Sequence, residues 1–232
     1  MLVDGKRLLV TGVLTGTSTA TLVARLAADQ GASVVLASPG GETLSLARQV
    51  ATQLPGPPPV VELDVTSAED LAALPDRLAP HVDGLDGVLH AVGCTSATAP
   101  GAGLLGTSWA DAGAGLRAST WSYAALAHAC APLWAPSASY VGLAPPAAPG
   151  ASGWTGVARA GLESANRYLA RDLGPRGVRV NLVASERPGA PTTSGSGADA
   201  LARACVALLS DWFPRTTGSV VRVDGGSGAV GV

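Results

Sequence analysis

The feature that most constrains the fold is a regular alternation of short apolar runs with helix-length segments. The apolar runs are rich in β-branched residues, as strands are, and they span residues 6–12, 33–38, 59–65, 85–93, 137–143, 177–183 and 218–225. The segments with helical character span residues 17–30, 41–53, 67–80, 109–131, 152–173 and 198–210. Strands that are apolar on both faces and separated by helices predict a parallel sheet covered on both sides, in one α/β domain spanning residues 1–232.

Composition narrows the class of protein. The net charge of −2 comes with no basic run, which argues against nucleic-acid binding. The three cysteines, Cys94, Cys130 and Cys205, are widely spaced in apolar surroundings and predict free buried thiols rather than disulfides or a metal site. The chain enters a strand pattern without a signal peptide, and no apolar run reaches the roughly 18 residues of a membrane helix. We therefore expect a cytoplasmic protein without a membrane span.

The segment VTGVLTGTSTA (10–20) follows the first predicted strand and opens the first predicted helix. Glycines and small hydroxyl residues at such a turn let the backbone approach a pyrophosphate, and the N–H groups at the helix start favour its negative charge. The alternative is an ordinary tight turn. Its position directly after the first strand favours the phosphate-binding interpretation.

A carboxylate follows the third predicted strand, where Asp64 precedes Val65. Asp64 would accept a hydrogen bond from the amino group of an adenine while Val65 packs on the ring; the alternative is that Asp64 caps the next helix. The segment ASPGG (37–41) after the second strand carries no arginine or lysine for a ribose 2′-phosphate. If a dinucleotide binds, the sequence favours NAD over NADP.

Five segments carry a family resemblance: DGKRLLVTGVLTGTSTA, VELDVTSAEDLA, LDGVLHAVG, ARAGLESANRYLARDLGPRGVRVNLVA and CVALLSDWFPRTTGSVVRVDGG. In this order they resemble the NADH-dependent enoyl-acyl-carrier-protein reductases of the InhA type, divergent members of the short-chain dehydrogenase/reductase superfamily. The resemblance covers residues 2–226. It implies a Rossmann sheet in the order 3-2-1-4-5-6-7 and commonly a homotetramer.

The resemblance also implies roles for particular residues. Gly12, Ser18 and Thr19 would lie by the pyrophosphate of NAD(H), and Asp64 and Val65 would hold its adenine. Gly93 would line the nicotinamide side of the site.

The residues expected to carry out the reaction depart from the family pattern. Family members carry a tyrosine, six residues and then a lysine; the tyrosine hydrogen-bonds the thioester carbonyl, and the lysine holds the nicotinamide ribose. Ser152 and Arg159 occupy that spacing here, and the only lysine of the chain is Lys6. Ser152 would donate a shorter-reaching hydrogen bond or cap a helix. Arg159 would hold the ribose or form a surface ion pair.

Two further departures lie after the sixth predicted strand. The family has Gly-Pro-Ile there to grip the nicotinamide carboxamide, whereas this chain has Glu186 and Arg187. Glu186 would weaken NAD(H) binding at the nicotinamide, act as a general base, or form an exposed charge pair. A short loop rich in Pro, Gly, Ser and Thr (185–199) replaces the family's long substrate lid, which argues against long-chain acyl substrates.

One more hydroxyl is a candidate for the missing tyrosine. Tyr123 lies on the predicted helix 109–131, which faces the active site in this family; the alternative is that it packs in the core.

Three functions follow from these residues. The first is a divergent NADH-dependent reductase of a small or carrier-bound enoyl or carbonyl substrate. The second is a redox-independent enzyme of specialised metabolism, such as a cyclase, isomerase or dehydratase. The third is a non-catalytic subunit that pairs with an intact paralogue. In each case we expect a homo-oligomer, a dimer or tetramer, or an assembly with that paralogue.

Overall fold

The structure is a computed structural model that describes residues 1–92, 103–145, 153–185 and 197–226. Its centre is a seven-stranded, all-parallel sheet in the order β3-β2-β1-β4-β5-β6-β7. The strands are β1 (Arg7–Thr11), β2 (Ser33–Ser38), β3 (Val60–Glu62), β4 (Leu85–His90), β5 (Trp134–Ala144), β6 (Arg179–Ser185) and β7 (Val220–Val223). The predicted Rossmann architecture and strand order are confirmed.

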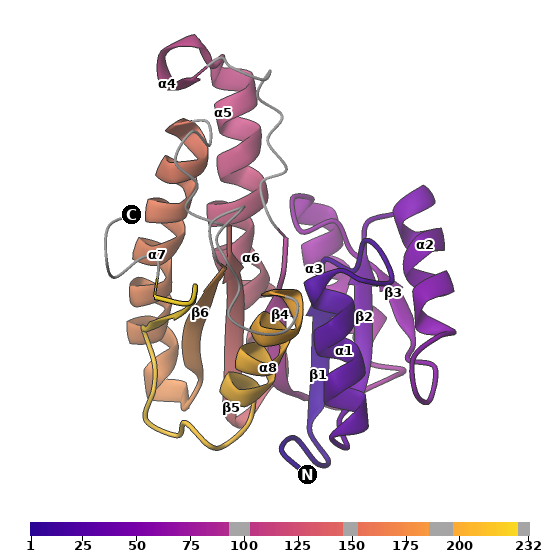
Figure 1. Ribbon diagram of the computed structural model, residues 1–232. Helices are drawn as coiled ribbons and strands as arrows, with labels where there is room; N and C mark the ends of the chain where they lie inside the picture. The colour runs from indigo at the N-terminus through magenta and orange to yellow at the C-terminus, as the bar shows by residue number, and fades with distance from the viewer. Residues whose placement is uncertain (93–102, 146–152, 186–196, 227–232) are drawn as a thin grey trace.

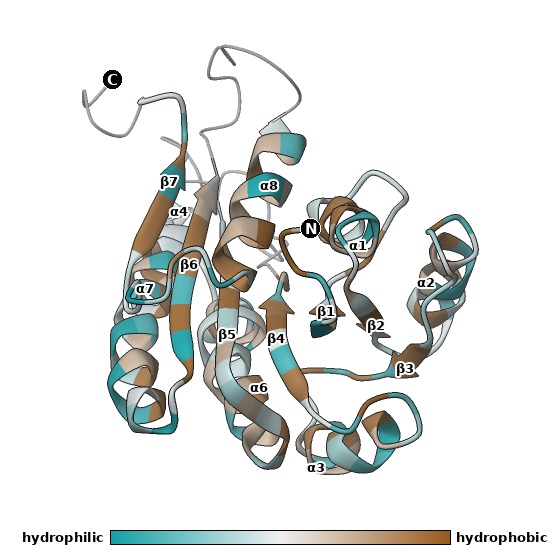
Figure 2. Ribbon diagram, turned by 90° about the horizontal axis from the view of Figure 1, so that it is seen from below, coloured by the Kyte–Doolittle hydropathy of each residue, from teal (hydrophilic) through white to brown (hydrophobic). Residues whose placement is uncertain are grey.

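Helices cover both faces of the sheet (Figure 2). One face carries α1 (Thr19–Asp29), α2 (Glu42–Ala51) and α8 (Gly197–Leu209). The other carries α3 (Ala68–Leu78), α6 (Ser122–Ala129) and α7 (Gly153–Leu173). Side chains of a strand alternate between the two faces, so each face has its own apolar cluster: Leu36 packs with α1, and Val35 packs on the α3 side.

The predicted helix 109–131 forms as three pieces. It begins as α5 (Trp109–Leu116), passes through a π-helical turn, η1 (Arg117–Trp121), and continues as α6. Ser119 and Ser122 donate their hydroxyls to the carbonyls of Gly115 and Ala118, four residues back, at 2.7 Å each. Such bonds compete with the α-helical ladder and bend helices, and we attribute the interruption to them.

Smaller elements complete the chain. They are α4 (Gly103–Gly106) and the 3₁₀ turns η2 (Ala131–Leu133) and η3 (Gly174–Arg176). Figure 1 shows that α4 and the start of α5 stand beyond the carboxyl end of the sheet. Both ends of the predicted loop 185–199 belong to neighbouring elements: Ser185 to β6 and residues 197–199 to α8. Residues 186–196 lie outside the described residues.

The described cysteines agree with the prediction of free thiols. Cys130 and Cys205 are fully buried and unpaired, and burial raises the pKa of both thiols. Cys94 lies outside the described residues. In the part of the chain that the structure describes, no helix is long and apolar enough to cross a bilayer, and no three metal-ligating side chains cluster.

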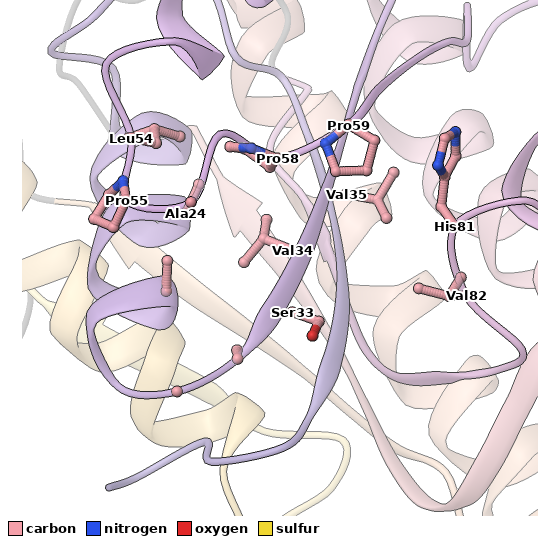
Figure 3. A pocket seen from close by; sticks show the side chains of 14 residues that line it. Ala24, Ser33, Val34, Val35, Leu54, Pro55, Pro58, Pro59, His81 and Val82 are labelled. Atoms are coloured by element: carbon pink, nitrogen blue, oxygen red, sulfur yellow. The ribbon is translucent and has the colours of Figure 1, made fainter.

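A cavity of about 550 Å³ lies at the amino end of the sheet, beside β2 (Figure 3). Val34 and Val35 line it from opposite faces of the strand, together with Pro58, Pro59 and His81. The first bond between β2 and the next segment runs from the Leu36 N–H to the Pro59 carbonyl. Pro59 has no N–H to continue the ladder toward Val34, so the sheet opens here. The cavity is therefore a consequence of the prolines, at the end opposite to the predicted cofactor residues.

Candidate functional site

The strand order reverses between β1 and β4, and the carboxyl ends of these strands form the crevice where sheets of this topology bind ligands. Gly12 follows β1 at this point, with a φ of +79°. A Cβ built on Gly12 would lie only 2.2 Å from the carbonyl oxygen of Ala91. The Thr11 hydroxyl donates to the Leu89 carbonyl at 3.0 Å and accepts from the Ala91 N–H at 3.2 Å. Only glycine fits at position 12, because these hydrogen bonds hold the segments that follow β1 and β4 close together.

The turn after Gly12 leads into the amino end of α1. Ser18 is the N-cap, and its hydroxyl accepts from the N–H of Thr21 at 3.3 Å. The hydroxyl of Thr21 donates to the Thr15 carbonyl at 2.6 Å and so fixes the turn below it. Thr19 is the first residue of α1, whose first turn carries no acidic residue. The positive end of the helix is thus open to an anion at the carboxyl edge of the sheet.

Asp64 follows β3 and closes a tight turn of its own. One carboxylate oxygen, Oδ1, accepts from both the N–H and the hydroxyl of Thr66, at 2.8 and 2.7 Å. The cap of α3 is Ser67, which accepts from the N–H of Asp70 at 3.2 Å. The alternative role of Asp64 as a helix cap is therefore not what the structure shows.

Neighbouring groups hold this turn from both sides. The Asp64 N–H donates to Asp70 at 2.8 Å, and this bond, together with the ion pair between Asp70 and Arg77, lowers the pKa of Asp70. On the other side, the guanidinium of Arg117 from η1 donates to the Thr66 carbonyl at 2.6 Å. Val65, 4 % exposed, anchors the turn in the core. The second oxygen of the Asp64 carboxylate, Oδ2, has no hydrogen-bond partner among the described residues.

Arg159 lies on α7 at the carboxyl end of β5. Its Nη1 donates to the carbonyl of Pro145, the residue after β5, at 2.9 Å. Its Nε pairs with Glu163, one turn along the helix, at 3.1 Å. The predicted ion pair of Arg159 is therefore present, and its contact with a nicotinamide ribose stays a prediction.

Tyr123 lies in the core, with its ring against His90, the last residue of β4. It is 0 % exposed, its hydroxyl donates to the Asn166 side chain at 3.0 Å, and its ring stacks on Tyr140 at 4.6 Å. Burial raises the pKa of its hydroxyl well above the ordinary value. The prediction of a replacement catalytic hydroxyl does not fit this position, because a substrate has no access to it.

Comparison with known proteins agrees with the geometry. Residues 12–198 match the family model described as enoyl-(acyl carrier protein) reductase. The NADH-dependent enoyl-[acyl-carrier-protein] reductase of Mycolicibacterium smegmatis is 35 % identical, over 97 % of both chains. That of Mycobacterium avium is 33 % identical, also over 97 % of both, and the FabI enzyme of Haemophilus influenzae is 33 % identical over 78 % of this chain and 70 % of its own.

The chain belongs to the enoyl-acyl-carrier-protein reductase family. Its resemblance to the InhA-type members of the short-chain dehydrogenase/reductase superfamily is thereby confirmed, and the sheet is the family's Rossmann sheet. The alignment with the M. smegmatis protein spans 263 positions, more than the 232 residues of this chain. That enoyl reductase therefore has residues for which this chain has no counterpart.

Three candidate residues of this enoyl reductase homologue lie outside the described residues: Gly93, Ser152 and Glu186. The sequence did not single out Thr66 and Arg117, although both hold the turn at Asp64. Thr66 had a local signal, since Asp followed two residues later by Thr is a common turn pattern. Arg117 had none, because its contact with Thr66 joins segments 51 residues apart.

Proposed function

We propose that the chain binds NAD(H) along the carboxyl edge of its sheet and is a reductase of a small or carrier-bound enoyl or carbonyl substrate. The observation that carries this proposal is the turn at Asp64. Its Oδ1 is committed to Thr66, which leaves Oδ2 oriented by a fixed turn and able to accept from the adenine amino group.

The contact between β1 and β4 supports the same proposal. Because Gly12 lacks a side chain, the segment after β4 lies directly against the turn that leads to the amino end of α1, where Ser18 and Thr19 lie and a pyrophosphate would bind. The relatives named above are NADH-dependent enoyl reductases, which is the same cofactor class. The cofactor would supply the hydride; the protein would supply its position.

At the reactive half, Arg159 is the described residue best placed to contribute. It lies beside Pro145 at the end of β5, and a nicotinamide ribose there would compete with the Pro145 carbonyl and Glu163 for its donors. We expect Arg159 to hold the ribose less firmly than the family lysine, because part of its guanidinium stays paired. Ser152 and Glu186 remain candidates for the proton and carbonyl chemistry.

The test is calorimetric titration of NADH and NAD⁺ into the wild type and the Asp64→Ala variant. We expect binding that Asp64→Ala weakens by about tenfold, as for loss of one hydrogen bond to a charged group. Asp76→Ala, which removes an exposed carboxylate from α3, is the control and should leave binding unchanged. Absence of binding at millimolar NADH would contradict the proposal.

A redox-independent enzyme on the same fold is the second candidate. It is favoured by the burial of Tyr123 and by the ion pair of Arg159, since the described residues then present no tyrosine–lysine pair. If NADH binds but enoyl thioesters of short chain length leave its absorbance unchanged, this candidate or the non-catalytic subunit replaces the reductase.

A further inference from the structure

The carboxyl end of β2 is where sheets of this topology place the adenosine ribose, and an acidic residue there commonly accepts a hydrogen bond from its hydroxyls. In this chain β2 ends at Ser38 and continues into Pro39, Gly40 and Gly41. None of these residues is acidic. A ribose at this position needs an acceptor from another element.

The neighbouring strand provides a carboxylate. Glu62 is the last residue of β3 and pairs in register with Ser38; Figure 1 shows the two strands side by side next to α2. A Cβ built on Gly40 would lie 2.3 Å from the Oε1 atom of Glu62. The absence of a side chain at Gly40 therefore makes room for the Glu62 carboxylate beside the turn that follows β2.

Two observations concern the order and the polarity of the turn that follows β2. The hydroxyl of Thr43, in the first turn of α2, donates to the carbonyls of Pro39 and Gly40 at 3.0 and 2.9 Å. Ser38 is 1 % exposed, and its hydroxyl has no partner among the described residues. Register partners in a parallel pair share a face, so the unpartnered hydroxyl of Ser38 lies on the same face as Glu62.

The charges around Glu62 favour a hydroxyl over a phosphate. The segment 37–42 contains no lysine or arginine. Arg77 is the nearby cation, but its guanidinium donates to the Glu62 carbonyl at 2.6 Å and to Asp70 at 3.0 Å. Among the described residues, a ribose 2′-phosphate would thus meet the Glu62 carboxylate without a free cation to compensate it.

We propose that Glu62, reaching across from β3 into the space at Gly40, accepts a hydrogen bond from the adenosine ribose 2′-hydroxyl and excludes a 2′-phosphate. This inference rests on the proposed function, because it assigns the specificity of the same cofactor site. Glu62 does from β3 what an acidic residue after β2 does in other sheets of this topology.

The experiment compares ADP-ribose with 2′-phospho-ADP-ribose by calorimetry, so that no reaction is needed for the readout. The wild type should bind ADP-ribose more tightly by about tenfold or more, from repulsion between the carboxylate and the phosphate. In Glu62→Gln the amide oxygen still accepts a hydrogen bond, so ADP-ribose binding should change by no more than about threefold. Binding of 2′-phospho-ADP-ribose should strengthen by about tenfold, because the repulsion is gone.

Two further variants sharpen the test. Gly40→Ala keeps every charge but displaces the Glu62 carboxylate, and should reduce the preference for ADP-ribose. Glu42→Gln removes an equal charge from α2 and should leave the preference within about twofold, since long-range exposed charges are screened.

An unchanged preference for ADP-ribose in Glu62→Gln overturns the inference. An equal loss of this preference in Glu42→Gln overturns it too, because the repulsion would then come from the general negative charge of the region and not from Glu62. If the wild type binds ADP-ribose and 2′-phospho-ADP-ribose equally, Glu62 excludes nothing while the proposed function stands. If it binds neither compound, the proposed function fails and this inference fails with it.

Discussion

His90 combines complete burial with an incomplete set of hydrogen bonds. It is the last residue of β4, is 0 % exposed, and its Nε2 lies 2.8 Å from the Ser122 hydroxyl. That hydroxyl donates to the Ala118 carbonyl, so it accepts from His90, and Nδ1 has no partner in the described part of the chain. Burial lowers the pKa of His90 to about 4, which keeps the ring neutral in the folded protein.

This predicts a specific acid sensitivity. In the unfolded chain a histidine has a pKa near 6.5, so protonation favours unfolding as the pH falls from about 6.5 toward 4. The free energy of unfolding should fall by about 2 kcal/mol between pH 7 and pH 4.5 from this residue alone. His90→Gln should lack this loss in denaturant titrations at the two pH values.

The control is His128→Gln, on the exposed side of α6. It should retain the wild-type loss. The aspartates with lowered pKa, Asp70, Asp83 and Asp86, lose their contributions only at lower pH, as they become protonated. An equal pH dependence in wild type and His90→Gln would contradict the assignment.

At the scale of elements, the π-helical turn η1 packs closely against α7. The Thr120 hydroxyl donates to the Ala158 carbonyl at 2.9 Å. Opposite it, a Cβ on Gly161 would lie 3.2 Å from that hydroxyl and 3.3 Å from the Thr120 methyl group. The contact also sets the position of Arg117, which begins the turn and holds the carbonyl of Thr66. Close packing at Gly161 thus helps to position the turn at Asp64.

Two glycines of α7 therefore respond differently to the same substitution. Gly161→Leu should destabilise the protein by about 1–3 kcal/mol, since the larger side chain has no space against Thr120. Gly156→Leu should stabilise it by about 0.5–1 kcal/mol, because a Cβ there meets nothing within 4 Å and leucine is the better helix former. Urea unfolding measures both, and destabilisation of equal size at the two sites would contradict the packing argument.

At the scale of the molecule, the outer face of α7 carries apolar side chains that the single chain leaves uncovered. Val157 is 42 % exposed and Tyr168 is 59 % exposed. They lie about three helical turns apart and so on the same side of the helix. Exposed apolar side chains on one side of a helix can belong to a surface buried between subunits. The homo-oligomer stays a prediction.

We expect the wild type to sediment as a dimer or tetramer, and the double variant Val157→Glu with Tyr168→Glu to sediment as a smaller species. Charges buried at an interface without partners weaken association strongly. Leu46→Glu changes a side chain on α2 that is 47 % exposed and should leave the assembly unchanged. Sedimentation velocity separates these outcomes, and an unaltered mass in the double variant would place the interface elsewhere.

Much of the fold, and part of the candidate site, could be predicted from local sequence patterns. The alternation of apolar runs and helical segments predicted the strands, helices and parallel sheet, because both periodicities are written along the chain. The Gly-rich turn at 10–20 and Asp64 could be proposed for the same reason, since each follows a strand. The individual roles of Gly12 and Ser18 came from the family resemblance. Arg159 was assigned from the residue spacing of the family; its ion pair with Glu163 is observed, and its contact with a ribose stays a prediction.

Tertiary structure decided what depends on contacts between distant segments. The Arg117 contact with Thr66 and the placement of Glu62 against Gly40 join segments that are far apart in sequence, and no local pattern predicts them. Tyr123 shows the same limit: its helix was predicted, but only the packing of β4, β5 and α7 against its side chain decided that its hydroxyl is buried. The sequence by itself determined where the chain turns at the carboxyl edge of the sheet, because turn and cap residues act locally; the fold decided which side chains meet there, because those contacts join distant segments.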